Sequence, residues 1–287
     1  MFQTFEPVSD KRFAGAHLPL LRARMSALTL DGFVVPHDDE YQNEYIPAYA
    51  ERLMWVSGFS GSAGAAVIMK DRAAIFVDGR YTLQVRDQVD DAFFAYEDLI
   101  ATPPDAWLAQ NVEKGARIGY DPMLHTQSSV NRLEAAAKKA GFQLVAVDEN
   151  PIDAAWTDQP AKPLTPARAH GVGFAGKSSA DKRADIAKAV AAAGADAALI
   201  TAPPSIAWLF NIRGGDVART PLPLGRALIR ADGSATLFLA PEKVDNQLPA
   251  HLGDAVDQRI GLVPHEDDRR PAALLTAEDR GDVDEHL

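Results

Sequence analysis

The sequence predicts an α/β fold made of two similar units, each a mixed sheet flanked by helices. Three observations support this fold class. Segments with helical periodicity alternate with short apolar segments along most of the chain, as in α/β layer structures. The pattern of the first part recurs in the second part, which indicates a repeated unit. A proline-rich stretch between the two parts marks a boundary.

The first unit opens with residues 17–29, whose apolar side chains share one helical face. Asp31 and Gly32 end this helix, and a buried strand is expected directly afterwards. The expected elements from there on are strands 33–35, 65–69 and 74–77, helix 80–88, helix 102–111, strand 116–119, helix 126–140 and strand 143–147. Gly141 stands where glycine commonly ends a helix, which supports the end of helix 126–140.

The second unit follows residues 150–176, where prolines interrupt the apolar periodicity. We therefore place the first domain at 1–155, a linker at about 156–175 and the second domain at 176–287. The elements that return in the second domain are helix 180–193, strand 197–201 and the strand pair 227–230 and 235–239.

Two tryptophans support the repeat. Trp208 precedes Gly214 by six residues, as Trp55 precedes Gly61. The second unit has no clear counterpart of residues 102–147. Its tail from Asp257 to Leu287 is acidic, and only Ala272–Leu275 is apolar. Whether the second domain is complete at its C-terminus therefore stays open. Truncation or a frameshift is one interpretation of this tail.

Composition excludes several classes of protein. Hydrophobic residues make up 47% of the 287 residues and charged residues 24%, which excludes a wholly disordered chain. With 29 Lys and Arg against 40 Asp and Glu, the formal charge is −11, so neither nucleic acid nor an anionic membrane is expected as a partner. The chain has no cysteine, which excludes disulfides and thiolate metal sites. Since no signal-like or membrane-spanning segment is visible, we expect a cytoplasmic protein.

The loop Gly58–Gly64 is the most conspicuous run of small residues. Such loops expose backbone N–H groups and can bind anions. This loop lacks the Lys-Ser/Thr of a phosphate-binding loop and precedes a strand. Tight packing of backbone against backbone is therefore the favoured interpretation.

Histidines and carboxylates form no compact metal-binding pattern. The 7 histidines are scattered, and none stands in H-E-x-x-H. His37-Asp38-Asp39-Glu40 is dense in hard ligands, yet a solvated acidic loop is the favoured interpretation, as it is for His265–Asp268. No nucleophile with a paired base can be assembled, so these residues predict neither a catalytic nor a metal site.

Arg80 is a candidate binding residue. Helix 80–88 would place its guanidinium in the first turn, where the helix dipole disfavours a cation. From there the side chain could reach a carbonyl or carboxylate outside the domain. A plain surface arginine is the simpler interpretation.

Other distinctive residues are assigned structural roles. Trp55 and Trp208 are expected in the core. The polar group Asn211, Arg213 and Asp216 follows an apolar run and is expected to stabilise a turn, with an interface as the alternative.

Two motifs, Trp55–Gly64 and Asp78-Gly79-Arg80-Tyr81 with Gln84, resemble the long, three-domain form of Xaa-Pro aminopeptidase. The further matches, in the family's order, are Val34–Pro36, Glu44–Ile46, Arg117–Pro122, Glu149–Pro160 and Ile206–Val217. The resemblance runs from about residue 15 to residue 245. Several long motifs in the right order make it specific.

The resemblance implies two tandem creatinase N-terminal-like domains followed by a pita-bread catalytic domain. In the family, that third domain holds a pair of Mn²⁺ or Zn²⁺ ions whose bridging water attacks the peptide bond before a proline in position two. None of its ligands is present, so we expect no metal, no catalytic residue and no activity of this chain alone. Arg80 matches the family arginine that contacts the bound peptide across the domain interface, which implies substrate binding without chemistry.

Two hypotheses follow from this resemblance. The first is a non-catalytic N-terminal region of an Xaa-Pro aminopeptidase that shapes access for peptides with proline in second position and could support a homodimer. The alternative is a stand-alone peptide-binding or assembly module. The chain departs from the family at Pro203–Ser205 and at Ala218–Pro221, which bears on how the second domain would contact a catalytic domain.

Overall fold

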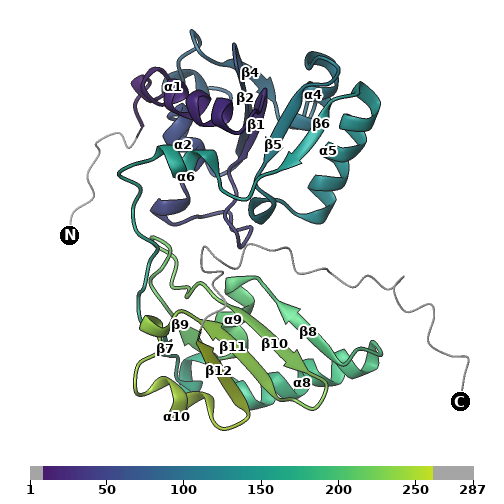
Figure 1. Cartoon of the computed structure of the whole chain (residues 1–287). Coiled ribbons are helices and arrows are strands. Elements are labelled where there is room, and N and C mark those ends of the chain that lie inside the picture. Colours follow the sequence, from purple (N-terminus) through teal and green to yellow (C-terminus); the bar gives the residue numbers. More distant parts are fainter. Residues whose placement is uncertain (1–8, 261–287) are drawn as a thin grey trace, which may run out of the picture.

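The computed structural model describes residues 9–260, which form two α/β domains one after the other (Figure 1). The elements of the first domain are α1 (Arg12–Ala27), β1 (Gly32–Pro36), η1 (Ala48–Ala50), α2 (Arg52–Ser57), β2 (Gly64–Met69), β3 (Ala73–Val77), α3 (Gln84–Gln88), β4 (Ala95–Asp98), α4 (Pro104–Asn111), β5 (Arg117–Tyr120), η2 (Pro122–Leu124), α5 (Gln127–Ala140), β6 (Gln143–Ala146) and α6 (Pro151–Ala155). Their sheet has the order β4-β3-β2-β1-β5-β6. Only β2 runs against its neighbours, so the sheet is mixed as predicted.

Helices cover both faces of this first sheet. Alternation along β1 sends Phe33 and Val35 to one face and Val34 to the other. The first face packs against α1, α2 and α6, and the second against α4 and α5. Strands buried on both sides are rich in apolar residues without polar alternation, and all five positions of β3 are buried.

The second domain uses fewer elements. These are β7 (Arg168–Ala169), α7 (Val172–Ala175), α8 (Ser179–Ala192), β8 (Ala197–Ile200), α9 (Pro203–Leu209), β9 (Ile212–Arg213), β10 (Arg226–Arg230), β11 (Ala235–Leu239), η3 (Pro241–Lys243), α10 (Leu248–Leu252) and β12 (Val256–Ile260). The main sheet has the order β12-β11-β10-β8, and β7 pairs with β9 in a small second sheet. Its core lies between this sheet and helices α8, α9 and α10.

Four strands of each domain follow the same pairing pattern. In both, the first strand pairs antiparallel with the second, the second antiparallel with the third, and the third parallel with the fourth. The matched positions include a glycine at the start of the second strand. A Cβ on Gly64 would lie 3.0 Å from the carbonyl oxygen of Phe76, and one on Gly225 would lie 2.7 Å from that of Phe238. The predicted repeat is therefore confirmed.

Several elements differ from the prediction. The strand β4 and the helix α2 were not expected. Nor was α9, which begins at Pro203 because proline fits the first helical position. The sequence predicts a separate tail from Asp257 onward, but the residues up to Ile260 belong to β12 and therefore to the sheet. Residues 261–287, including the expected acidic loop at 265–268, lie outside the described part of the chain.

The segment between the domains is partly built into the second one. Its strand β7 pairs with β9, and Ala167 is buried in the second core. The domain limits at 155 and 176 stay predictions. Within residues 9–260, the helices are all too short or too polar to cross a bilayer.

The two domains touch along a small seam. Its apolar members are Ile46, Tyr49 and Ala50 from the first domain and Val217 and Leu224 from the second. Beside them, Arg226 donates a hydrogen bond to the backbone oxygen of Glu40 (3.1 Å). The Arg226 guanidinium also lies 4.8 Å from the ring centre of Tyr41, within the range of a cation–π contact.

The expected solvated acidic loop at 37–40 is wrong. Asp39 is fully buried, and its carboxylate accepts the backbone N–H groups of Tyr41 (3.0 Å) and Asn43 (3.1 Å). Burial raises the pKa of Asp39 despite these bonds. His37 is buried too, and Glu40 is half-buried. The loop turns inward because its own backbone satisfies the carboxylate and the second domain covers it.

Candidate functional site

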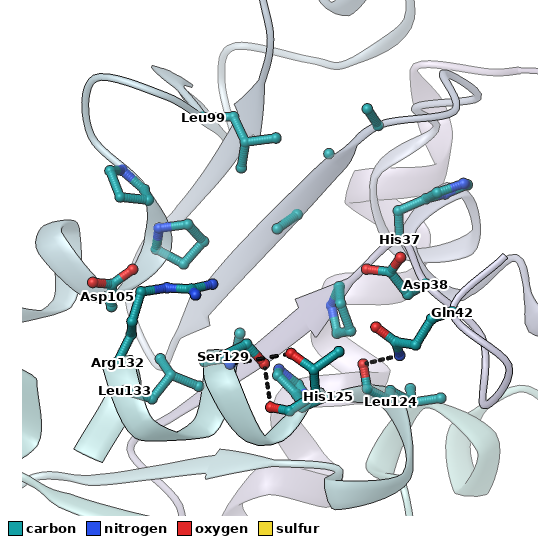
Figure 2. Close-up of a pocket in the computed structure, with 18 of the residues that line it drawn as sticks. His37, Asp38, Gln42, Leu99, Asp105, Leu124, His125, Ser129, Arg132 and Leu133 are labelled. Atoms are coloured by element: carbon teal, nitrogen blue, oxygen red, sulfur yellow. Dashed lines mark hydrogen bonds between the residues drawn. The ribbon is translucent and has the colours of Figure 1, made fainter. Parts of the chain in front are cut away.

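A cavity of about 570 Å³ opens at one end of the first sheet (Figure 2). Its lining includes residues that directly follow β1 and β4, and the turn after β3. These strands run in one direction, so their carboxyl ends share this edge. Ligands of α/β proteins commonly bind in the crevice outside the carboxyl ends of the strands.

Two walls of mixed charge face the cavity. One carries His37 and Asp38 at the end of β1, and the other carries Arg132 on α5 and Asp105 on α4. Figure 2 shows Arg132 extending from α5 toward the space between the walls. Gln42 closes one side by donating a hydrogen bond to the backbone oxygen of Leu124 (3.1 Å).

Arg80 lines the same cavity and is anchored by Asp78. The Asp78 carboxylate accepts from the Arg80 backbone N–H (2.9 Å), from Nε (3.1 Å) and from Nη2 (2.7 Å). This pairing lowers the pKa of Asp78 and raises the pKa of Arg80. The Arg80 side chain is nevertheless 61% exposed. Its other N–H groups remain available to a partner outside the domain.

The expected position of Arg80 in the first turn of a helix is wrong. The helix α3 begins at Gln84, and Arg80 lies in a turn closed by the bond from the Tyr81 N–H to the Asp78 oxygen (3.0 Å). The helix dipole therefore does not act on this guanidinium. The Asp78 side chain fixes it instead, through the two-residue reach typical of aspartate turns.

A polar network beside Arg80 was not found from the sequence. The Tyr81 hydroxyl accepts the backbone N–H of Ser62 (3.1 Å) and lies 2.9 Å from the Ser62 Oγ. Ser62 Oγ in turn donates to Glu44 Oε1 (3.1 Å). The Arg80 guanidinium lies 5.2 Å from the Tyr81 ring centre. All of these residues lie within the quoted family motifs, which is the signal that could have found them.

His125, which lines the cavity, makes the stability of the protein depend on pH. Burial lowers the pKa of His125 below its usual 6.5, although its Nδ1 lies 2.9 Å from the Asp121 backbone oxygen. Around pH 6 the unfolded chain then binds more protons at this residue than the folded chain. Its stabilising effect is full above pH 6.5 and is lost as the pH falls toward the lowered pKa.

We expect His125→Gln to weaken the acid-induced loss of stability. Urea unfolding at pH 7.5 and pH 5.5 measures this, because only the change between the two pH values reports the titration. The wild-type chain should lose more unfolding free energy on acidification than the variant. An equal loss in both would contradict the assigned role of His125.

The Gly58–Gly64 loop packs tightly, as predicted. A Cβ on Gly61 would lie 2.3 Å from the Phe59 ring. Phe59 is buried and meets the Tyr81 ring edge-on at 5.5 Å. The far end of the loop, from Ser62 to Gly64, lines the cavity. The loop thus supports the cavity wall through packing.

The two tryptophans differ. Trp55 is buried, as predicted, between the His17 ring (4.2 Å) and the Trp156 ring (5.8 Å). Trp208 is 48% exposed, so its predicted core position is wrong. In the part of the second domain that the structure describes, no counterpart of α6 and Trp156 covers it.

The turn-stabilising role predicted for Asn211, Arg213 and Asp216 is supported by their hydrogen bonds, and Arg213 donates to the backbone oxygen of Ala207 (3.1 Å). Asn211 Oδ1 accepts from the buried Lys182 Nζ (2.6 Å). Asp216 is fully buried and accepts from Lys243 Nζ (2.7 Å) and from the Leu224 N–H (2.6 Å). These contacts hold the chain around β9. Among residues 9–260, no three His, Asp or Glu side chains are grouped to bind a metal ion.

Comparison with known proteins identifies both domains. The creatinase/prolidase N-terminal domain family matches twice, over residues 18–154 and 158–271. A probable Xaa-Pro aminopeptidase P of Paracoccidioides brasiliensis is 36% identical over 83% of this chain, and aminopeptidase P1 of Lotus japonicus is 36% identical over 82%. The matched regions make up 39% and 36% of those relatives.

A solved structure extends the likeness to three dimensions. The X-prolyl aminopeptidase of Caenorhabditis elegans, described as a cytosolic enzyme with a di-nuclear active site, superposes with a TM-score of 0.79 at 29% identity. The superposition covers 86% of this chain and 42% of that enzyme. The chain therefore belongs to the creatinase/prolidase N-terminal domain family, carries two such domains in tandem, and corresponds to the N-terminal region of the Xaa-Pro aminopeptidases.

Proposed function

We propose that this chain acts as the non-catalytic, substrate-access part of an Xaa-Pro aminopeptidase and that Arg80 binds the peptide. The observation that carries the proposal is the anchored but exposed guanidinium at the cavity rim. Asp78 fixes its direction, so little rotamer entropy is lost when it binds a partner. Its open N–H donors suit a carbonyl or carboxylate of a peptide with proline in second position.

The reaction itself is assigned to the remainder of such an enzyme. The family implies a pair of Mn²⁺ or Zn²⁺ ions, but the donor groups among residues 9–260 do not fit one. We therefore derive no step through these metals. Arg80 would hold the peptide in register while the scissile bond is attacked elsewhere.

The test of Arg80 joins residues 9–260 to the remaining part of the C. elegans enzyme. In this chimera, Arg80→Ala should raise KM for an Xaa-Pro peptide about tenfold or more, because a hydrogen bond to a charged group contributes about 1.5–3 kcal/mol. Arg86→Ala is the matched control, since Arg86 is also exposed and also lies 5.2 Å from a tyrosine ring. Equal KM values for the two variants would refute the role of Arg80.

The chain alone should not hydrolyse Xaa-Pro peptides, even with added Mn²⁺. The reason is the lack of a metal-binding group in the described part. Mass spectrometry of the peptide measures the release of its N-terminal residue. The protein sample is one whose intact mass has been verified. Activity that copurifies with the chain would overturn the non-catalytic assignment.

Homodimerisation and a cytoplasmic location extend the proposal. Homodimerisation is carried over from the family resemblance, and the cytoplasmic location is supported by the cytosolic C. elegans enzyme. Light scattering across a concentration series measures the first, and a fluorescent fusion at native expression measures the second.

A further inference from the structure

The second sheet has one face that no described helix covers. Strand register shows which residues of the two sheets correspond. Val34 pairs with Val67 in the first sheet, and Leu199 pairs with Leu228 at the same positions of the second sheet. Val34 and Val67 are buried beneath α4 and α5. Leu199 is 63% exposed, and Leu228 is only half-buried.

Phe238 extends this uncovered face. It occupies the position on β11 that Phe76 occupies on β3, because Phe76 pairs with Ala65 and Phe238 with Arg226. Phe76 is fully buried, whereas Phe238 is half-buried. We call Leu199, Leu228 and Phe238 the open face, and Arg226 and Arg230 flank Leu228 on the same side of β10. The opposite side of the same sheet packs on α8, α9 and α10.

In the first domain, helix α4 shows what covers this position. Its Trp107 and Leu108 are buried neighbours in the sequence. The Trp107 ring meets the Phe76 ring edge-on, with 6.2 Å between their centres. Leu108 belongs to the same buried cluster as Val67. A helix that presents two adjacent large apolar side chains is therefore the element that fits.

The sequence contains such a pair after β12. Leu274 and Leu275 follow Pro271 by three and four residues, as Trp107 and Leu108 follow Pro104. An alanine precedes the apolar pair in both segments, at 273 and 106. Both segments also come after the fourth strand of their domain. The two segments thus share a spacing, a residue pattern and a place in the chain.

We propose that the open face is the docking surface for the segment Pro271–Glu278 of this same chain, with Leu274 against Phe238. The occupant is set by the repeat, because the segment stands where α4 stands in the first copy. Its three apolar side chains give a reason for docking, since exposed apolar side chains gain free energy by burial. This inference is independent of the proposed function.

Engineered cysteines test the docking directly, because the chain has none of its own. The test variant is Phe238→Cys with Leu274→Cys in the full chain, treated with a short bismaleimide. The control variant is Phe238→Cys with Ala277→Cys, since Ala277 corresponds to the exposed Gln110 of α4. We expect an intramolecular crosslink severalfold more abundant in the test variant, measured by mass spectrometry after proteolysis.

Every other outcome overturns the proposal. Equal yields in the two variants mean an unspecific encounter, and absence of a crosslink means that the segment does not dock on the open face. A crosslink between two molecules means that a second copy occupies the open face. Leu228→Cys with Leu275→Cys repeats the measurement with Phe238 intact, and circular dichroism before crosslinking verifies that each variant is folded.

Discussion

Replacing Lys243 by methionine is expected to destabilise the protein by about 3–5 kcal/mol. Lys243 Nζ lies 2.7 Å from Asp216 Oδ2 and 3.1 Å from the Leu224 backbone oxygen. Both side chains of the pair are buried. Lys243→Met removes the cation and leaves a buried carboxylate without its counter-charge. The large effect therefore comes from the unpaired charge.

Urea unfolding, followed by circular dichroism, measures this effect, and Lys188→Met is the matched control. Lys188 also pairs with a carboxylate, at 3.8 Å from Asp185 Oδ1, but the two side chains are 80% and 53% exposed. An exposed pair contributes about 0–1 kcal/mol. Adding Asp216→Leu to Lys243→Met should restore part of the loss. Similar effects of the two lysine variants would contradict this account of the buried pair.

Gly58→Ala is expected to cost about 3 kcal/mol. Gly58 ends α2 with φ of +88°, a conformation that L-residues adopt only under strain. An added Cβ would lie 2.8 Å from the backbone oxygens of both Asp10 and Gln88. Backbone atoms from two separate segments would have to move. The strain and the overpacking therefore add to each other.

Gly79→Ala is the control for this prediction. Gly79 belongs to the other strong motif, yet a Cβ there meets nothing within 4 Å and its φ is not positive. Thermal unfolding should therefore place Gly79→Ala near the wild type and Gly58→Ala well below it. A similar melting temperature for both variants would show that the loop accommodates an added Cβ at position 58 without loss of stability.

The sheets and the repeat could be predicted because local patterns determine them. Alternation fixes which side of β1 each residue faces, and Gly141 ends α5 as predicted. Features that depend on distant partners could not be predicted this way. The 37–40 loop is buried partly by Arg226, which lies 186 residues from its partner Glu40.

The candidate site likewise has a part that local sequence predicts and a part that depends on distant partners. The sequence singled out Arg80, and its family resemblance gave it a role. The turn that holds it depends on contacts that periodicity does not report: Asp78 binds the Arg80 N–H, and Tyr81 binds Ser62, 19 residues earlier. The predicted core position of Trp208 was wrong for a related reason. Its exposure depends on which elements pack over it, and its own segment of sequence does not report them.

The matched glycines 64 and 225 bear on the history of the chain. Each copy has a glycine at the corresponding strand position, close to the carbonyl oxygen of the corresponding phenylalanine, as expected for a duplicated unit. The copies have since diverged: Ala65 and Met69 in one copy correspond to Arg226 and Arg230 in the other. One of these arginines now holds the neighbouring domain at Glu40. The two domains are thus joined by a residue at which the two copies differ.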